Sequence, residues 1–68
     1  MTKERIINGR MYKISERPDG RFQVVGCEEY NGIVGPVYIE TDELYIFDHH
    51  FEMRDFLRCI NGGKEVKL

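Results

Sequence analysis

The chain has 68 residues, enough for one small domain, and its 41% hydrophobic and 32% charged residues are ordinary for a globular protein. It contains no low-complexity tract and no solenoid repeat, which excludes a repeat architecture. The net charge is −2, and the longest apolar run, residues 44–47, is far too short to cross a bilayer. With no secretory signal, we expect a cytoplasmic protein in which Cys27 and Cys59 are reduced thiols.

Charge is distributed unevenly along the chain. Residues 1–26 include six basic and three acidic side chains, and the last fifteen residues carry a net charge of +2. Residues 27–53 include no Lys or Arg and seven acidic side chains. Such segregation favours a surface with regions of opposite sign. The alternative is that strand pairing brings the basic and acidic segments side by side and cancels the field.

The first predicted elements are two short strands. Residues 5–7 are followed by Asn8-Gly9, the dipeptide most typical of a two-residue hairpin turn. Residues 10–16 then alternate between apolar and polar side chains, as a half-buried strand does.

The clearest turn signal is Arg-Pro-Asp-Gly-Arg at residues 17–21, where Pro and Asp suit a type I turn and Gly suits the left-handed position that follows. Pairing the two arginines predicts a hairpin register that gathers apolar side chains on one face. That face is Tyr12, Ile14, Phe22 and Val24. The opposite, outer face is Met11, Lys13, Ser15, Gln23, Val25 and Cys27.

The middle of the chain is rich in turn signals. Asn31-Gly32 and Gly35-Pro36 predict a loop over residues 28–35. Residues 37–40 are then expected to form a strand, 41–43 a turn, and 44–47 a final strand. An alternative interpretation starts a helix near Asp42, with Thr41 as its cap.

The last element is a helix. Met53, Phe56, Leu57 and Ile60 follow the i, i+3, i+4, i+7 spacing of an apolar stripe, and Gly62 is the expected left-handed residue at its end. We therefore predict one α+β domain over residues 1–68, an antiparallel sheet of three to five strands packed on one face by a C-terminal helix. Residues 62–68 form either a frayed tail or a short edge strand.

No catalytic or metal-binding motif stands out. His49 and His50 are adjacent and point in different directions, and no Cys or His pair has the spacing of metal ligands. Cys59 lies late on the predicted helix, where the negative end of the dipole disfavours a thiolate. We therefore expect neither an enzyme nor a cofactor.

The first functional hypothesis is a non-catalytic protein-interaction or regulatory module. With the apolar stripe turned inward, Phe51, Arg54 and Arg58 lie on the outer helix face, a composition typical of interface hot spots. The acidic middle segment is the second candidate region, because a partner with a basic surface would be steered toward it. Its candidate residues are Glu28, Glu29 and Asp42.

Two alternatives remain open. A nucleic-acid-binding module would use the basic N-terminal hairpin, although the overall acidity is unusual for that class. Its candidate contacts are Arg10, Lys13, Arg17 and Arg21. A structural subunit would instead form a homodimer through the outer sheet face, where Met11, Val25 and Cys27 invite a second copy.

Overall fold

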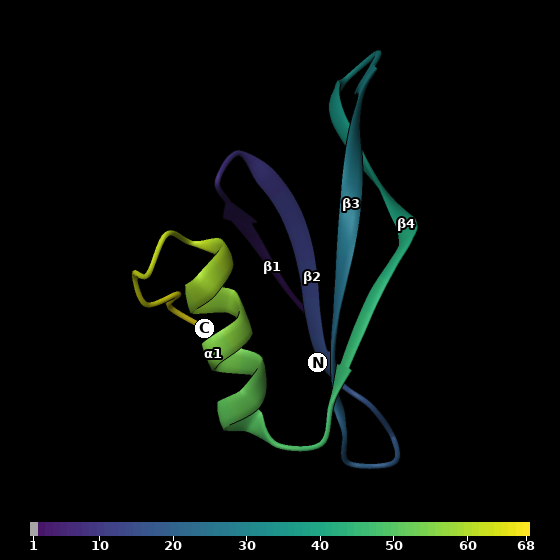
Figure 1. Ribbon diagram of the computed structural model, residues 1–68. Helices are drawn as coiled ribbons and strands as arrows, with labels where there is room; N and C mark the ends of the chain where they lie inside the picture. Colours follow the sequence, from purple (N-terminus) through teal and green to yellow (C-terminus); the bar gives the residue numbers. More distant parts are fainter. Residues whose placement is uncertain (1) are drawn as a thin grey trace.

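The computed structural model describes residues 2–68, which form a four-stranded antiparallel sheet followed by one helix (Figure 1). Each strand lies beside its neighbour in the sequence, in the order β1-β2-β3-β4. The predicted fold class is confirmed. The elements are β1 (Thr2–Ile7), β2 (Arg10–Glu16), β3 (Phe22–Gly32), β4 (Gly35–Phe47) and α1 (His50–Ile60).

The first two turns follow the sequence signals. Asn8 and Gly9 have φ angles of 51° and 79°, the left-handed conformations that a type I′ turn requires. In the second turn, the Arg17 N–H donates to the Arg21 carbonyl at 2.6 Å. The predicted register is confirmed, because Ile14 pairs with Val24 across the β2–β3 hairpin.

The core lies between α1 and the inner face of the sheet. Its buried members come from four of the five elements: Ile7, Tyr12, Ile14, Val24, Met53 and Leu57. Aromatic side chains close its β4 side, with the ring of Phe56 on the helix 4.5 Å from Tyr45 and 5.3 Å from Phe47, measured between centroids. The predicted apolar stripe of the helix therefore does face the sheet.

Local capping fixes the ends of the helix. The Glu52 carboxylate accepts a hydrogen bond of 3.1 Å from the His49 backbone N–H at the first turn. At the other end Gly62 has a φ of 68°, the left-handed conformation expected there. The tail that follows forms no strand, but Val66 and Leu68 pack against the core.

Two predictions for the middle segment are wrong. Residues 28–35 are not a loop, since β3 continues to Gly32 and β4 begins at Gly35, leaving only Ile33 and Val34 in the turn. Residues 41–43 are neither a turn nor the start of a helix. They form a bulge in β4, because three residues lie opposite Gly26 where one would continue the ladder.

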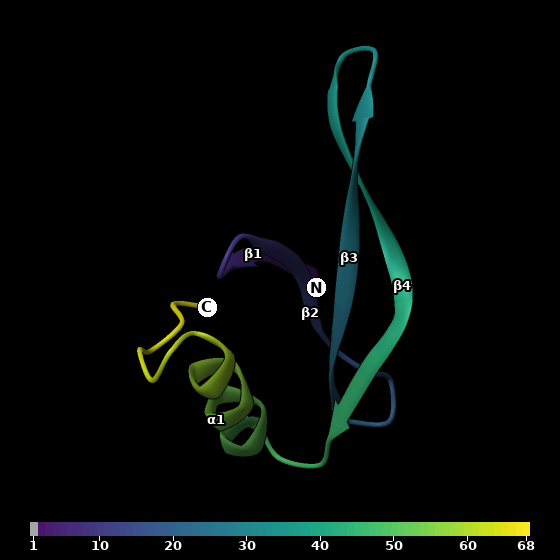
Figure 2. The same ribbon diagram turned by 45° about the horizontal axis from the view of Figure 1, so that its top comes forward.

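The outer half of the β3–β4 hairpin projects beyond the rest of the molecule (Figures 1 and 2). A helix of 11 residues is about 16 Å long, whereas a strand of 13 residues spans about 43 Å, so α1 cannot cover all of β4. Since β2 pairs with β3 only as far as Gly26, residues 28–39 form a two-stranded ribbon, which we call the arm.

The outer face of the sheet is partly closed without a helix. Val25 is buried there, flanked in register by Lys13 and Leu44, and Cys27 is 2% exposed. Burial raises the pKa of the Cys27 thiol, which makes it a structural side chain rather than a reactive one. Leu44 and Ile46 remain exposed on the same face.

Truncating a core residue and an arm residue should have very different effects on stability. Leu57 is fully buried, so Leu57→Ala should lower the free energy of unfolding by about 2–5 kcal/mol, measured by urea denaturation. Val37 lies on the arm and is exposed, so Val37→Ala should change it by less than about 0.5 kcal/mol. Equal losses in the two variants would show that the arm belongs to the cooperative core.

Candidate interaction surfaces

The three predicted helix residues do lie together on the outer surface. Phe51 is 64% exposed, and its ring stacks on His49 with 5.5 Å between centroids. Phe51, Arg54 and Arg58 line a shallow hollow of about 230 Å³, together with Asp55, Glu65 and Val66. Phe51 therefore points outward in the structure, as predicted.

Both arginines of this hollow already have acidic partners. Arg54 lies 2.5 Å from the Glu65 carboxylate in the tail, and Arg58 lies 3.1 Å from Asp55 one turn earlier on the helix. Exposed ion pairs of this kind contribute little to stability, but they do neutralise the local charge. A partner at this face would have to displace or share these carboxylates.

The predicted acidic residues do not form one patch, and they lie far from the helix face. Glu28 and Glu29 are consecutive on β3, so their side chains point to opposite faces of the arm. Asp42 lies in the bulge at the base of the arm. In both views the arm extends away from α1, so the two predicted regions do not form one continuous surface (Figures 1 and 2).

Each of the four basic residues proposed as nucleic-acid contacts forms an ion pair. Arg10 binds Glu43, and Lys13 lies 3.9 Å from Glu40 across the sheet. Arg17 and Arg21 pair with Asp19 at 3.6 Å and with Asp48 at 3.1 Å. Three of these pairs join the basic N-terminal segment to the acidic middle segment, so the opposite charges cancel at these contacts, as one of the two expectations for the charge pattern had it.

Sequence reasoning missed a group of exposed apolar residues on the arm, including the two most exposed among residues 2–68. Ile33 and Val34 are fully exposed at its tip. Tyr30, Val37 and Ile39 are about half exposed, and alternation places these three side chains on one face together with Glu28. The sequence predicts the strand over residues 37–40, but the turn signals at 31–32 and 35–36 make residues 28–35 resemble a loop and hide the pairing that forms this face.

Each carboxylate of the arm lies next to a tyrosine. The Tyr30 hydroxyl donates to Glu28 at 2.6 Å, and this hydrogen bond raises the pKa of Tyr30. On the other face, a hydrogen bond to Glu29 raises the pKa of Tyr38 in the same way. The two phenols therefore stay protonated and act as donors at neutral pH.

A cluster at the root of the arm joins it to the rest of the sheet. Arg10 binds Glu43, and its guanidinium lies over the Tyr12 ring, 5.5 Å from the centroid. Glu43 also accepts a hydrogen bond of 2.5 Å from the Tyr45 hydroxyl. Together the Arg10 and Glu43 side chains occupy the space above Gly26, where an added Cβ would lie 2.5 Å from a Glu43 oxygen.

The Thr41 side chain shapes the bulge at the same place. Its hydroxyl donates to the Gly26 carbonyl at 2.8 Å and accepts from the Glu43 N–H at 3.2 Å. These two bonds satisfy the Gly26 carbonyl and the Glu43 N–H where the ladder is interrupted. The bulge is thus a bonded joint between the arm and the rest of the sheet.

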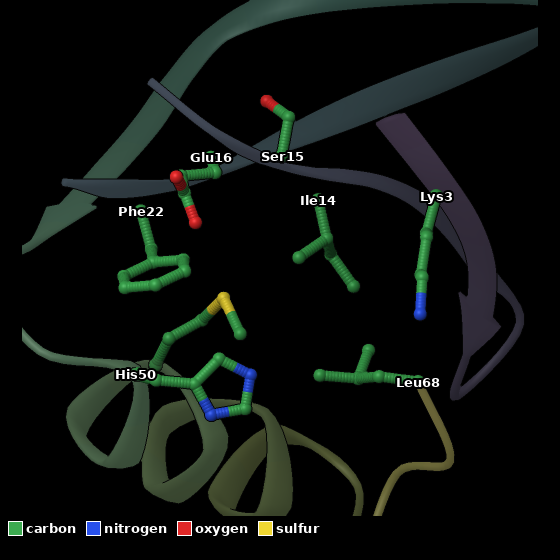
Figure 3. Close-up of a pocket in the computed structure, with 8 residues that line it drawn as sticks. Lys3, Ile14, Ser15, Glu16, Phe22, His50 and Leu68 are labelled. Atoms are coloured by element: carbon green, nitrogen blue, oxygen red, sulfur yellow. The ribbon is translucent and has the colours of Figure 1, made fainter. Parts of the chain in front are cut away.

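A larger hollow of about 450 Å³ lies between the helix and the strands (Figure 3). Four of its eight lining residues are apolar, and the rings of Phe22 and His50 meet edge to face at 5.2 Å. The Ser15 hydroxyl points away from the hollow, so it does not form a nucleophile–base pair with His50. The lining residues are Lys3, Ile14, Ser15, Glu16, Phe22, His50, Met53 and Leu68.

Residues 2–68 contain neither a cluster of metal ligands nor a membrane-spanning helix. No three His, Cys, Asp or Glu side chains in this range are grouped as metal ligands would be. The helix in this range is too short and too polar to span a membrane.

Comparison with known proteins does not assign this chain to a family. No family model matches the sequence, and neither curated proteins nor solved structures give a significant match.

The root cluster should make stability depend on pH through Glu43. The Tyr45 hydrogen bond and the Arg10 ion pair lower the pKa of Glu43 in the folded state. The stabilisation of the fold by ionised Glu43 is therefore complete above the pKa that Glu43 has in the unfolded state. It is lost as the pH falls through the pKa of Glu43 in the folded state. Glu43→Gln should lower the free energy of unfolding by up to ~1 kcal/mol at neutral pH, and the difference from wild type should disappear in acid.

Urea denaturation over a pH series measures this difference. Asp42→Asn is the matched control, because Asp42 is an exposed carboxylate in the same bulge and has no ion pair among residues 2–68. It should match wild type at each pH. A Glu43→Gln deficit that persists in acid would show that the Glu43 charge is not its cause.

Proposed function

We propose that this protein is a non-catalytic module that binds another protein through the arm. The observation that carries the proposal is the apolar surface of the arm, which the helix and the tail leave uncovered. Ile33 and Val34 at the tip project furthest, and Tyr30, Val37 and Ile39 extend the same surface toward the root.

The energetics of this surface favour a partner. Burying an exposed Val or Ile side chain completely contributes about 1.5–3 kcal/mol, so several on one ribbon can supply most of a specific interaction. Exposed apolar groups that cluster on a projecting element are typical of interaction sites rather than of a solvated surface. In this chain they lie along the ribbon that projects beyond the rest of the molecule.

The backbone of the arm supports the same proposal. Residues 28–32 of β3 and 35–39 of β4 pair only with each other, so each strand has one free edge. Free strand edges offer N–H and C=O groups to a partner strand. Pro36 removes one donor near the tip and leaves the middle of the arm as the better pairing site.

The helix face is a weaker candidate for the same activity. Phe51 is exposed, but Arg54 and Arg58, the cations expected to recognise a partner, are already paired with Glu65 and Asp55. The ion pairs of the N-terminal hairpin weigh against nucleic acid in the same way, because phosphate binding would need free cations.

A second copy of the chain is the second candidate partner. Leu44 and Ile46 are exposed next to Val25 on the outer sheet face, which no helix covers. A two-fold dimer would bury these residues against their own equivalents. This contact involves the sheet and not the arm, so substitution can separate the two interactions.

Capture from a lysate of the source cells tests the proposal. The double substitution Ile33→Ser with Val34→Ser removes the apolar tip, and both residues are fully exposed, so the fold should be unaffected. The proteins retained by tagged wild type, identified by mass spectrometry after nuclease treatment, should include at least one whose recovery falls about ten-fold with this variant.

Two matched variants locate the interface. Phe51→Ser removes an exposed apolar side chain from the helix, and Leu44→Ser removes one from the outer sheet face. Neither should reduce recovery of the arm-dependent protein. Loss with Phe51→Ser alone would move the interface to the helix, and self-capture lost with Leu44→Ser alone would favour the homodimer. A signal that disappears with nuclease would favour nucleic acid.

A further inference from the structure

The arm carries negative charge that the rest of the chain does not neutralise. Residues 27–53 include no Lys or Arg, and within residues 2–68 no basic side chain forms an ion pair with Glu28 or Glu29. The nearest cations stop at the root, where Arg10 binds Glu43 and Lys13 reaches Glu40. Beyond that point the arm bears carboxylates alone.

These two carboxylates are held beside apolar side chains. Glu28 pairs across the ladder with Ile39 and accepts the Tyr30 hydroxyl on the same face. Glu29 pairs with Tyr38 on the opposite face, and its carboxylate raises the pKa of the Tyr38 hydroxyl. Each face of the arm therefore combines an aromatic side chain with one anion, and a carboxylate oriented as Glu28 is loses little entropy when it meets a cation.

A surface of this kind selects the chemistry of its partner. An apolar group that covers Tyr30, Val37 and Ile39 also brings the Glu28 carboxylate into a drier environment, where an unpaired charge is costly. The partner must therefore place a cation beside it. The arm of a second copy would place like charges together, and nucleic acid or an anionic membrane would repel both carboxylates.

We infer that the arm binds a protein cleft that is apolar at its centre and rimmed by Lys or Arg side chains. This inference rests on the proposed function, since it names the partner of the same arm. The apolar tip residues Ile33 and Val34 fill the centre, and Glu28 and Glu29 meet the basic rim on either side of the ribbon.

The test compares carboxylate and amide forms of the arm. Glu28→Gln with Glu29→Gln keeps the shape of both side chains and their ability to accept the tyrosine hydrogen bonds, and removes only the charge. The protein whose capture depends on the arm tip is identified, purified and titrated by calorimetry at low and high NaCl. The double variant should bind about ten-fold more weakly at low salt, and wild-type binding should weaken as salt rises.

Glu16→Gln is the matched control, because Glu16 is exposed, lies outside the arm and forms no ion pair within residues 2–68. It should bind as wild type does. If the double glutamine variant binds equally well or more tightly, the basic rim is wrong while arm binding stands. If no captured protein depends on Ile33 and Val34, the proposed function and this inference both fail.

Discussion

The length of the β3–β4 hairpin relative to the single helix determines the rest of the structure. The helix has 11 residues and β4 has 13, and a strand rises more than twice as far per residue as a helix. The core can therefore form only beneath the helix, and the remainder of the hairpin stands as a bare ribbon. A two-stranded ribbon is only marginally stable by itself. The orientation of the arm therefore depends on the Thr41 bulge and on the Arg10–Glu43 ion pair at its root.

Local sequence signals predict the elements next to the core, whereas the structure of the arm depends on pairing between residues that are distant in the sequence. The turn at residues 17–21 sets its own register, and the helix stripe depends only on spacing. In the arm, Asn31-Gly32 and Gly35-Pro36 are strong turn signals on both sides of the true two-residue turn, so they resembled a loop. The bulge at 41–43 was mistaken for a turn because one sequence cannot show that three residues lie opposite Gly26.

The charge pattern alone also could not predict the surface charge, because that depends on which strands pair. Segregated charges predict either a signed surface or mutual cancellation, and the strand order decides between them. Here β2 carries Arg10 and Lys13, and β4 brings Glu43 and Glu40 within reach across β3, so the basic hairpin is neutralised. The arm extends beyond this compensation. Its apolar face and its unpaired carboxylates follow from one cause, the absence of any element beside it.

Shortening the arm tests this account most directly. Replacing residues 28–39 with Asn-Gly would close Cys27 and Glu40, which already pair, with a two-residue hairpin turn. The shortened protein should keep its helix and its cooperative unfolding, with a midpoint close to wild type, and should no longer capture the arm-dependent partner. A shortened protein that fails to fold would show that the arm is structural, and one that folds and still captures the partner would place the interface elsewhere.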